Sequence, residues 1–130
     1  MKTAKKLGIW MDYSIAHIME FSENPFEVKT IESRFTQEEK EKTVAKGESH
    51  LHHKEQQLQS EYFKEITHVI LNYDKVLLFG PTNAKSELFN ILSKDHRFEK
   101  IKIHIEETDK MDVYEKQAFI NGHFSSPLYR

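Results

Sequence analysis

The most strongly apolar part of the chain is a continuous run, Val76–Phe79, in which hydrophobic and polar residues do not alternate. Such a run is typical of a parallel strand buried on both faces of a sheet. Gly80-Pro81 ends it, because proline has no N–H to give to a neighbouring strand. Thr82 or Asn83 is placed to cap a following helix, in which apolar residues recur at helical spacing: Ala84, Leu88, Ile91 and Leu92. The pattern predicts a buried strand, a tight turn and an amphipathic helix, which together make half of a βαβ unit.

Three strands are predicted before this unit. Leu7–Asp12 and Ile15–Phe21 carry apolar residues on both faces and are joined by a tight turn at Tyr13-Ser14. This pattern suits strands near the middle of a covered sheet. Glu27–Ser33 is more polar and suits an edge, where charged side chains discourage pairing with another molecule.

The remaining elements follow from helical spacing and alternation. Leu51–Asn72 is predicted as the longest helix, with the apolar stripe Leu58, Tyr62, Ile66, Val69 and Ile70. Lys94–Glu99 is a connector, and Ile101–Ile105 alternates as a half-exposed strand does. Asp112 and Glu115 have capping-box spacing and open a last helix that carries Val113, Phe119 and Ile120, with Gly122 as its expected stop.

The element order βββαβαβα predicts an α/β fold. Three antiparallel strands followed by two right-handed crossovers give a mixed five-stranded sheet with helices on both faces. The most economical strand order is 3-2-1-4-5, the ribonuclease H-like arrangement. Residues 1–130 are expected to form one domain, with a mobile loop over 34–49 and a loose tail over 125–130.

Composition narrows the class of function. The formal net charge of −2 argues against a strongly electrostatic nucleic-acid binder, although it leaves a local basic patch open. The chain has no cysteine, which excludes a disulfide framework and a thiolate metal site. No segment approaches the roughly 20 apolar residues of a membrane span, so we expect no membrane partner and, by default, a cytoplasmic protein.

Candidate chemistry gathers where the parallel strands are predicted to end, because binding sites in such sheets tend to lie there. The helix after Gly80-Pro81 offers unpaired N–H groups and a positive dipole end, and Lys85 adds a charge one turn later. This turn is a candidate anion or RNA site, while a plain βα turn is the alternative. Asp109 is expected either to cap the last helix or to pair with Lys85. The candidates at this rim are Gly80, Thr82 and Lys85, with the carboxylates Asp12, Glu106 and Asp109.

Two groups of residues suggest metal-dependent alternatives. A two-metal nuclease needs several converging carboxylates, and Asp12 has a suitable place on the first strand. However, the fourth strand ends in Phe79-Gly80, where an acidic residue would be required. His50 and His53 share a helix face and are possible ligands, but a solvated helix start also explains them. No metal and no cofactor is therefore assigned.

Three segments resemble a known family. They are HLHHKEQQLQSEYFKEITHVI, then VLLFGPTNAKSELFNIL, then IEETDKMDVYEKQAFINGHF. They are similar to small bacterial release-factor-like (translational machinery) proteins, which are related to the middle domain of the archaeal and eukaryotic class 1 peptide release factor and of Pelota. The Gly-Pro-x-x-Ala-Lys pattern within Leu77–Leu88 is a moderately specific marker of the family. The resemblance implies the release-factor middle-domain fold and a role near the ribosome, related to stress or rescue.

The family's catalytic tripeptide has no counterpart here. Release factors carry Gly-Gly-Gln after the third strand, whereas this chain has Gly47-Glu48-Ser49. The leading hypothesis is thus a non-catalytic, translation-associated domain that binds ribosome or RNA. Its contact region is expected in Arg34–His53, with Lys46, His50 and His53 as candidates helped by Lys85. A protein-interaction module and a metal-dependent nuclease are the alternatives, and the oligomeric state is left open.

Overall fold

The computed structural model describes residues 4–21, 26–34 and 48–125. Residues 35–47 of the predicted loop, which include Lys46, and residues 126–130 of the predicted tail lie outside this range. The elements are β1 (Lys6–Met11), β2 (Ile15–Glu20), β3 (Phe26–Glu32), α2 (Glu48–Ile70), β4 (Lys75–Gly80), α3 (Ala84–Ser93), the 3-10 helix η1 (His96–Phe98), β5 (Lys102–Glu107) and α4 (Val113–Phe124).

The strands form a five-stranded sheet in the order β3-β2-β1-β4-β5, so the predicted fold class and strand order are confirmed. β1 pairs antiparallel with β2 and parallel with β4. β2 pairs antiparallel with β3 across an irregularity between Ile18 and Met19, and β4 pairs parallel with β5. The continuous apolar run of β4 lies between two parallel neighbours, where both of its faces are covered.

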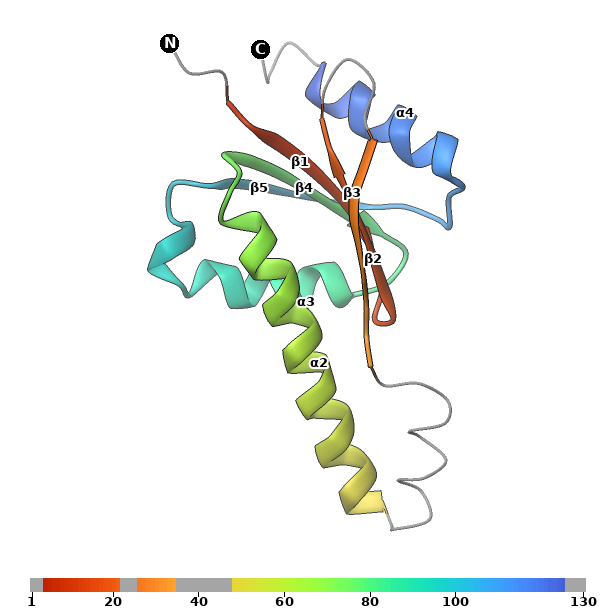
Figure 1. The fold of residues 1–130 in the computed structure, drawn as a ribbon, viewed down its shortest axis with the longest axis vertical. Coiled ribbons are helices and arrows are strands. Elements are labelled where there is room, and N and C mark those ends of the chain that lie inside the picture. The colour runs from red at the N-terminus through yellow and green to blue at the C-terminus, as the bar shows by residue number, and fades with distance from the viewer. Residues whose placement is uncertain (1–3, 22–25, 35–47, 126–130) are drawn as a thin grey trace.

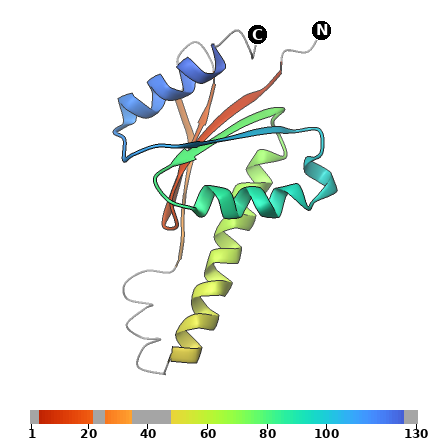
Figure 2. The ribbon, with the colours of Figure 1, turned by 180° about the vertical axis from the view of Figure 1, so that it is seen from behind.

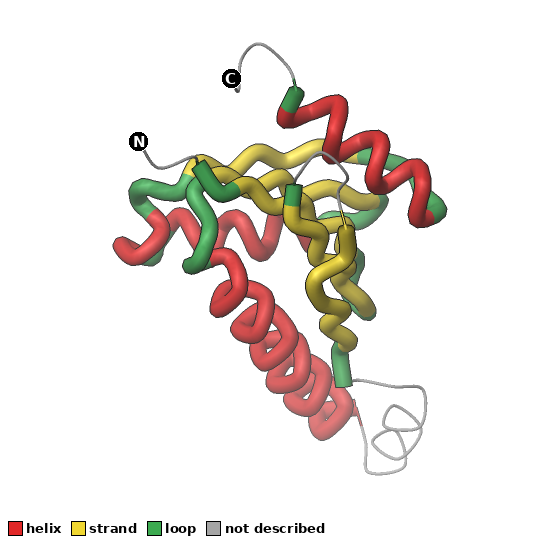
Figure 3. Tube along the Cα trace, turned by 45° about the horizontal axis from the view of Figure 1, so that its top comes forward, coloured by secondary structure: helices red, strands yellow, loops and turns green. Residues whose placement is uncertain are grey.

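Helices cover both faces of the sheet (Figure 1). α2 and α3 lie on one face and α4 lies alone on the other, as Figure 3 also shows. Side chains alternate between the two faces along each strand, which creates two separate apolar clusters. The cluster beneath α2 and α3 includes Leu7, Ile9, Ile66, Leu78 and Leu88. The cluster beneath α4 includes Trp10, Met19, Leu77, Phe79, Ile120 and Phe124.

The close approach of α4 to β1 depends on a glycine. A Cβ added to Gly8 would lie 2.4 Å from Cγ1 and 2.5 Å from Cδ1 of Ile120. Beside this contact, the ammonium of Lys116 lies 4.3 Å from the ring centroid of Trp10. Because Gly8 has no side chain, Ile120 packs directly onto the backbone of β1.

Several predicted boundaries and faces are wrong. α2 spans Glu48–Ile70 rather than the predicted Leu51–Asn72, so it includes Glu48 and Ser49 of the predicted loop. Gly122 does not stop α4, which continues to the buried Phe124. Ile91 is 48% exposed and Val113 is 50% exposed, so neither belongs to the core. The buried face of α3 instead includes Lys85, and Val113 precedes the part of α4 that reaches the sheet.

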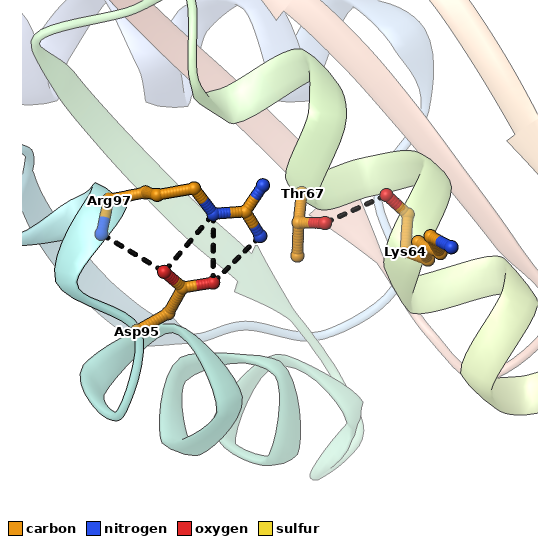
Figure 4. Close-up of polar contacts among 4 residues, drawn as sticks. All are labelled: Lys64, Thr67, Asp95 and Arg97. Carbon is orange, nitrogen blue, oxygen red and sulfur yellow. Dashed lines mark hydrogen bonds and ion pairs between the residues drawn. The ribbon is translucent and has the colours of Figure 1, made fainter.

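The connector after α3 is ordered by local polar contacts (Figure 4). The Asp95 carboxylate accepts the backbone N–H of Arg97 at 3.0 Å and pairs with the Arg97 guanidinium at 2.7 Å. These contacts cap η1 and lower the pKa of Asp95. In the neighbouring helix α2, the Thr67 hydroxyl donates to the Lys64 carbonyl at 2.7 Å. The predicted connector therefore contains a short helix, which buries Phe98.

Candidate functional site

The parallel strands end together at one edge of the sheet. The residues that follow β1, β4 and β5 meet there, because the Thr108 N–H donates to the Gly80 carbonyl at 3.1 Å. Gly80 has a φ of +150°, and an added Cβ would lie 2.2 Å from the Met11 carbonyl oxygen. This position requires glycine, since other residues rarely adopt that φ and a side chain would strike β1.

Lys85 is buried at this edge rather than presented to solvent. The residue is 2% exposed, and its ammonium donates to the Thr82 carbonyl and pairs with the Glu107 carboxylate. Thr82 also accepts the Ala84 N–H through its hydroxyl at 3.3 Å, whereas Asn83, the N-cap residue of α3, makes no side-chain cap hydrogen bond. The charge of Lys85 is thus used to join α3 to β5. This arrangement favours a structural role over the predicted anion site at Gly80, Thr82 and Lys85.

Asp12 is also engaged locally. Its carboxylate accepts the N–H groups of Ser14 at 2.7 Å and Ile15 at 2.9 Å, which closes the β1–β2 turn. The Tyr62 hydroxyl of α2 donates to the Asp12 carbonyl at 2.9 Å. Burial, together with the nearby Asp12 charge, raises the pKa of Tyr62, so the phenol stays protonated as a donor. Asp12 therefore holds the hairpin turn to α2.

The other rim carboxylates are separated by strand alternation. Glu106 lies on the α4 side and contacts His104 at 2.7 Å, whereas Glu107 lies on the α3 side with Lys85. The cap of α4 is Asp112, with the predicted capping box, so Asp109 takes neither of its two expected roles. Within the described residues, no group of three His, Asp or Glu side chains could hold a metal ion. This arrangement does not favour the two-metal nuclease.

The histidine candidates lie at the far end of α2. His50 and His53 both fall within this helix, and His53 is exposed. The side chain of His50 and the whole of Lys46 lie outside the described residues. In Figure 1 the start of α2 extends beyond the end of the sheet, so this segment is placed away from the two apolar clusters.

A cavity of about 310 Å³ opens between the β1–β2 turn and the helices α2 and α3. It is lined by Tyr13, Ser14, Ser33, Glu55, Gln59 and Glu87. Burial and a hydrogen bond with Glu87 raise the pKa of Tyr13 to about 12, so its phenol is a neutral donor near pH 7. Gln59 donates to Glu87 at 3.4 Å. The cavity offers hydrogen-bonding groups and two carboxylates, which suits binding more than nucleophilic chemistry.

Sequence reasoning missed this cavity. Tyr13 was assigned only to a turn, and Gln59 and Glu87 lie on the polar faces of two helices. Helical spacing does mark both as outward-facing, but only the packing of α2 beside α3 brings them together. The feature that the sequence could have indicated is an aromatic residue at the tip of a tight hairpin, a position usually taken by small polar residues.

Comparisons with known proteins identify the fold. No family model and no curated protein matches this sequence. Among solved structures, Pelota from Archaeoglobus fulgidus aligns with 95% of this chain and 32% of its own, with a TM-score of 0.62 and 9% identity. Pelota from Thermoplasma acidophilum aligns with 95% of this chain and 33% of its own, with a TM-score of 0.59 and 13% identity. The archaeal translation termination factor aRF1 aligns with 89% of this chain and 33% of its own, with a TM-score of 0.57 and 14% identity.

This chain has the fold of one part of Pelota and aRF1. It spans about a third of the length of each of these proteins. The expected resemblance to a release-factor domain is therefore confirmed at the level of fold. In the part of the chain that the structure describes, no helix is long and apolar enough to cross a membrane.

Proposed function

We propose that this protein is a non-catalytic, translation-associated domain that binds the ribosome or RNA. The observation that carries the proposal is the structural match to Pelota and aRF1, which extends over 95% of the chain in the Pelota alignments. The fold of this chain is thus similar to a part of aRF1, a translation termination factor, and of Pelota. The binding function itself is our proposal.

The non-catalytic part of the proposal rests on the residues present. The chain has four glycines, Gly8, Gly47, Gly80 and Gly122, so no Gly-Gly-Gln occurs in it. Three charged side chains of the rim are engaged locally: Asp12 closes a turn and Lys85 pairs with Glu107. Such engaged groups suit a scaffold, with recognition located elsewhere on the surface.

We place the ribosome contact at the start of α2 and the segment that precedes it. Lys46, His50 and His53 lie there, and Lys54 follows in the same helix. This region has charges of both signs, so contacts made by it alone should depend only weakly on salt. A binding surface at the end of an extended helix is reached by a partner without disturbing the core.

Co-sedimentation with ribosomes tests this proposal. The full chain should pellet with ribosomes at low salt, and Lys46→Ala/Lys54→Ala should reduce the pelleted fraction several-fold. Lys94→Ala/Lys100→Ala removes the same charge from the two residues that flank η1, away from the start of α2, and should leave pelleting unchanged. Failure of the unaltered chain to pellet at the lowest salt concentration would refute the proposal.

A protein partner is the second candidate, because one cavity has an apolar side. It lies between α2 and α3, has a volume of about 470 Å³, and includes Phe63 and the 48%-exposed Ile91 in its lining. Affinity capture followed by mass spectrometry distinguishes the two functions. A dominant non-ribosomal protein whose capture is lost in Ile91→Asp would favour the interaction module over ribosome binding.

A further inference from the structure

The strand β5 has one side of its backbone directed away from the sheet. It is the outermost strand, next to β4, and runs between α3 and α4 in the view of Figure 2. The N–H groups of Lys102 and Thr108 donate to carbonyls at either end of β4, at 3.0 Å and 3.1 Å. Successive residues of a strand point their N–H and C=O groups to alternate sides, so those of Ile103 and Ile105 point outward. An edge of this kind is a template for pairing with another strand.

The sequence of β5 is complementary to itself in an antiparallel pair. Lys102, His104 and Glu106 lie on the α4 face, as the contact of His104 with a ring of α4 shows. Ile103 and Ile105 lie on the α3 face. When two copies pair about His104, Lys102 of each copy lies opposite Glu106 of the other, and Ile103 lies opposite Ile105. The arrangement has two-fold symmetry, so each of these contacts occurs twice.

This register also satisfies the outward backbone groups. Ile103 of one copy and Ile105 of the other form a hydrogen-bonded pair, in which two residues exchange both of their N–H···O bonds. Lys102 and Glu106 then form non-hydrogen-bonded pairs, in which the Cα atoms are about 4.5 Å apart and the side chains are closer. The opposite charges are therefore adjacent across the pair.

Other registers fit less well. A shift by two residues in one direction places Ile103 opposite Glu107, which already pairs with Lys85. A shift by two in the other direction needs the N–H of Ile101, which donates to the Phe98 carbonyl at 3.1 Å. A shift by one residue opposes each isoleucine to a residue whose N–H points to β4. The pairing about His104 is thus the register that the strand favours.

An apolar hollow beside this edge would receive part of the second copy. Its volume is about 340 Å³, and it lies between α3, η1 and β5. Its lining includes Phe89, Phe98, Ile101 and Ile103. In the antiparallel pair, Ile105 of the second copy lies beside Ile103 on the same face of the sheet. Covering this hollow removes apolar surface from water, which favours association.

We propose that this chain forms a two-fold symmetric dimer, in which the β5 strands of two copies pair antiparallel about His104 and join the two sheets into one. The charge order of β5 favours a second copy over an unrelated strand, because Lys102 and Glu106 match their own reversed order. Glu106 also contacts His104 within its own chain at 2.7 Å, but a carboxylate accepts several donors. This inference goes beyond the proposed function and does not depend on it.

Sedimentation velocity over a range of protein concentrations tests the dimer. The unaltered chain should change from the 15.5 kDa monomer to twice that mass as its concentration rises. Lys102→Glu and Glu106→Lys each turn two attractive pairs into like-charged pairs, so each variant should dimerise at least about tenfold more weakly. The control Lys29→Glu makes the first of these charge changes at an exposed position of β3, on the opposite edge of the sheet. It should leave dimerisation unchanged.

Mixing the two single variants tests the register. In the mixed pair, a strand with two acidic residues at these positions lies opposite a strand with two lysines, so the dimer should return. The double variant Lys102→Glu/Glu106→Lys reverses both charges and should dimerise as the unaltered chain does. Lys102 is exposed and Glu106 is half-buried, and thermal melting checks that each variant is folded.

Hydrogen exchange locates the contact. The amides of Ile103 and Ile105 should exchange more slowly at concentrations where the dimer forms, whereas the Lys102 amide, bonded to the Asp74 carbonyl, should be protected at all concentrations. A chain that stays monomeric up to about 1 mM would overturn the inference. So would a dimer that Lys102→Glu does not weaken, or one that Lys29→Glu abolishes. Slowed exchange at Ile103 only in the presence of another protein would overturn it in favour of a strand from that protein.

Discussion

Replacing Gly8 with alanine tests how α4 is held against the sheet. The new Cβ would lie 2.4 Å and 2.5 Å from two carbons of Ile120, far inside normal contact distance. Both residues are enclosed, since Gly8 is buried and Ile120 is fully buried. α4 must therefore shift or Ile120 must leave its preferred rotamer. Overpacking of this kind costs about 1–3 kcal/mol of unfolding free energy.

Gly122→Ala is the matched control. It makes the same chemical change in α4, but nothing lies within 4 Å of the added Cβ. Alanine is favoured over glycine inside a helix, so this variant should be more stable by about 0.5–1 kcal/mol. The two substitutions therefore have opposite expected signs, although each adds one methyl group.

Urea unfolding measures both effects. The single tryptophan, Trp10, lies in the cluster beneath α4, so its fluorescence reports on this interface directly. With a urea m-value of about 2 kcal/mol per M, Gly8→Ala should lower the midpoint by about 0.5–1.5 M. Adding Ile120→Val to Gly8→Ala should cost less than Ile120→Val costs alone, because it removes the Cδ1 atom and so relieves one of the two close contacts, while the contact with the γ carbon remains. A midpoint for Gly8→Ala equal to that of the unaltered chain would refute the packing argument.

Three further predictions concern polar groups. Glu107→Ala should lower the free energy of unfolding by about 1–3 kcal/mol, which is more than the loss expected for Lys85→Met. Glu107→Ala leaves a buried ammonium without its carboxylate, whereas Lys85→Met leaves a carboxylate in water. Chemical denaturation of the two variants measures this difference. Burial and the neighbouring His104 lower the pKa of His123, so the unfolded chain takes up the proton first and stability should fall as pH drops below about 6.5. Urea midpoints at two pH values should show a smaller loss in His123→Gln. Asp12→Ala removes the acceptor of two N–H groups and should lower stability by about 1–2 kcal/mol in thermal or urea melts.

The sheet was predictable because its signals are local. The continuous apolar run of β4 marks a central parallel strand, and the polar third strand marks an edge. Together with the rule that crossovers are right-handed, these signals make 3-2-1-4-5 the most economical strand order. The capping box at Asp112 and Glu115 was likewise readable, since both partners lie within one helical turn.

The contacts of the charged side chains at the ends of the parallel strands were not predictable in the same way. Lys85 is a polar residue on a short amphipathic helix, and its burial depends on Glu107, which is 22 positions later in the chain. The cavity beside Tyr13 likewise needs residues from two helices and a hairpin. Glycine often ends a helix, which is why the sequence predicts a stop at Gly122, but burial of Phe124 outweighs the cost of glycine inside the helix.

The uneven packing of α2 predicts how the amide hydrogens of this one helix exchange with solvent. His53–Gln57 are exposed or half-buried, and Leu58 is the first residue of α2 described as buried. Short helical segments without tertiary contacts are marginal in water, so amides before Leu58 should exchange through local opening. Amides around Ile66, which is fully buried, should exchange only when the whole domain unfolds. A partner that grips the beginning of α2 would therefore be detected as slowed exchange there, with no change near Ile66.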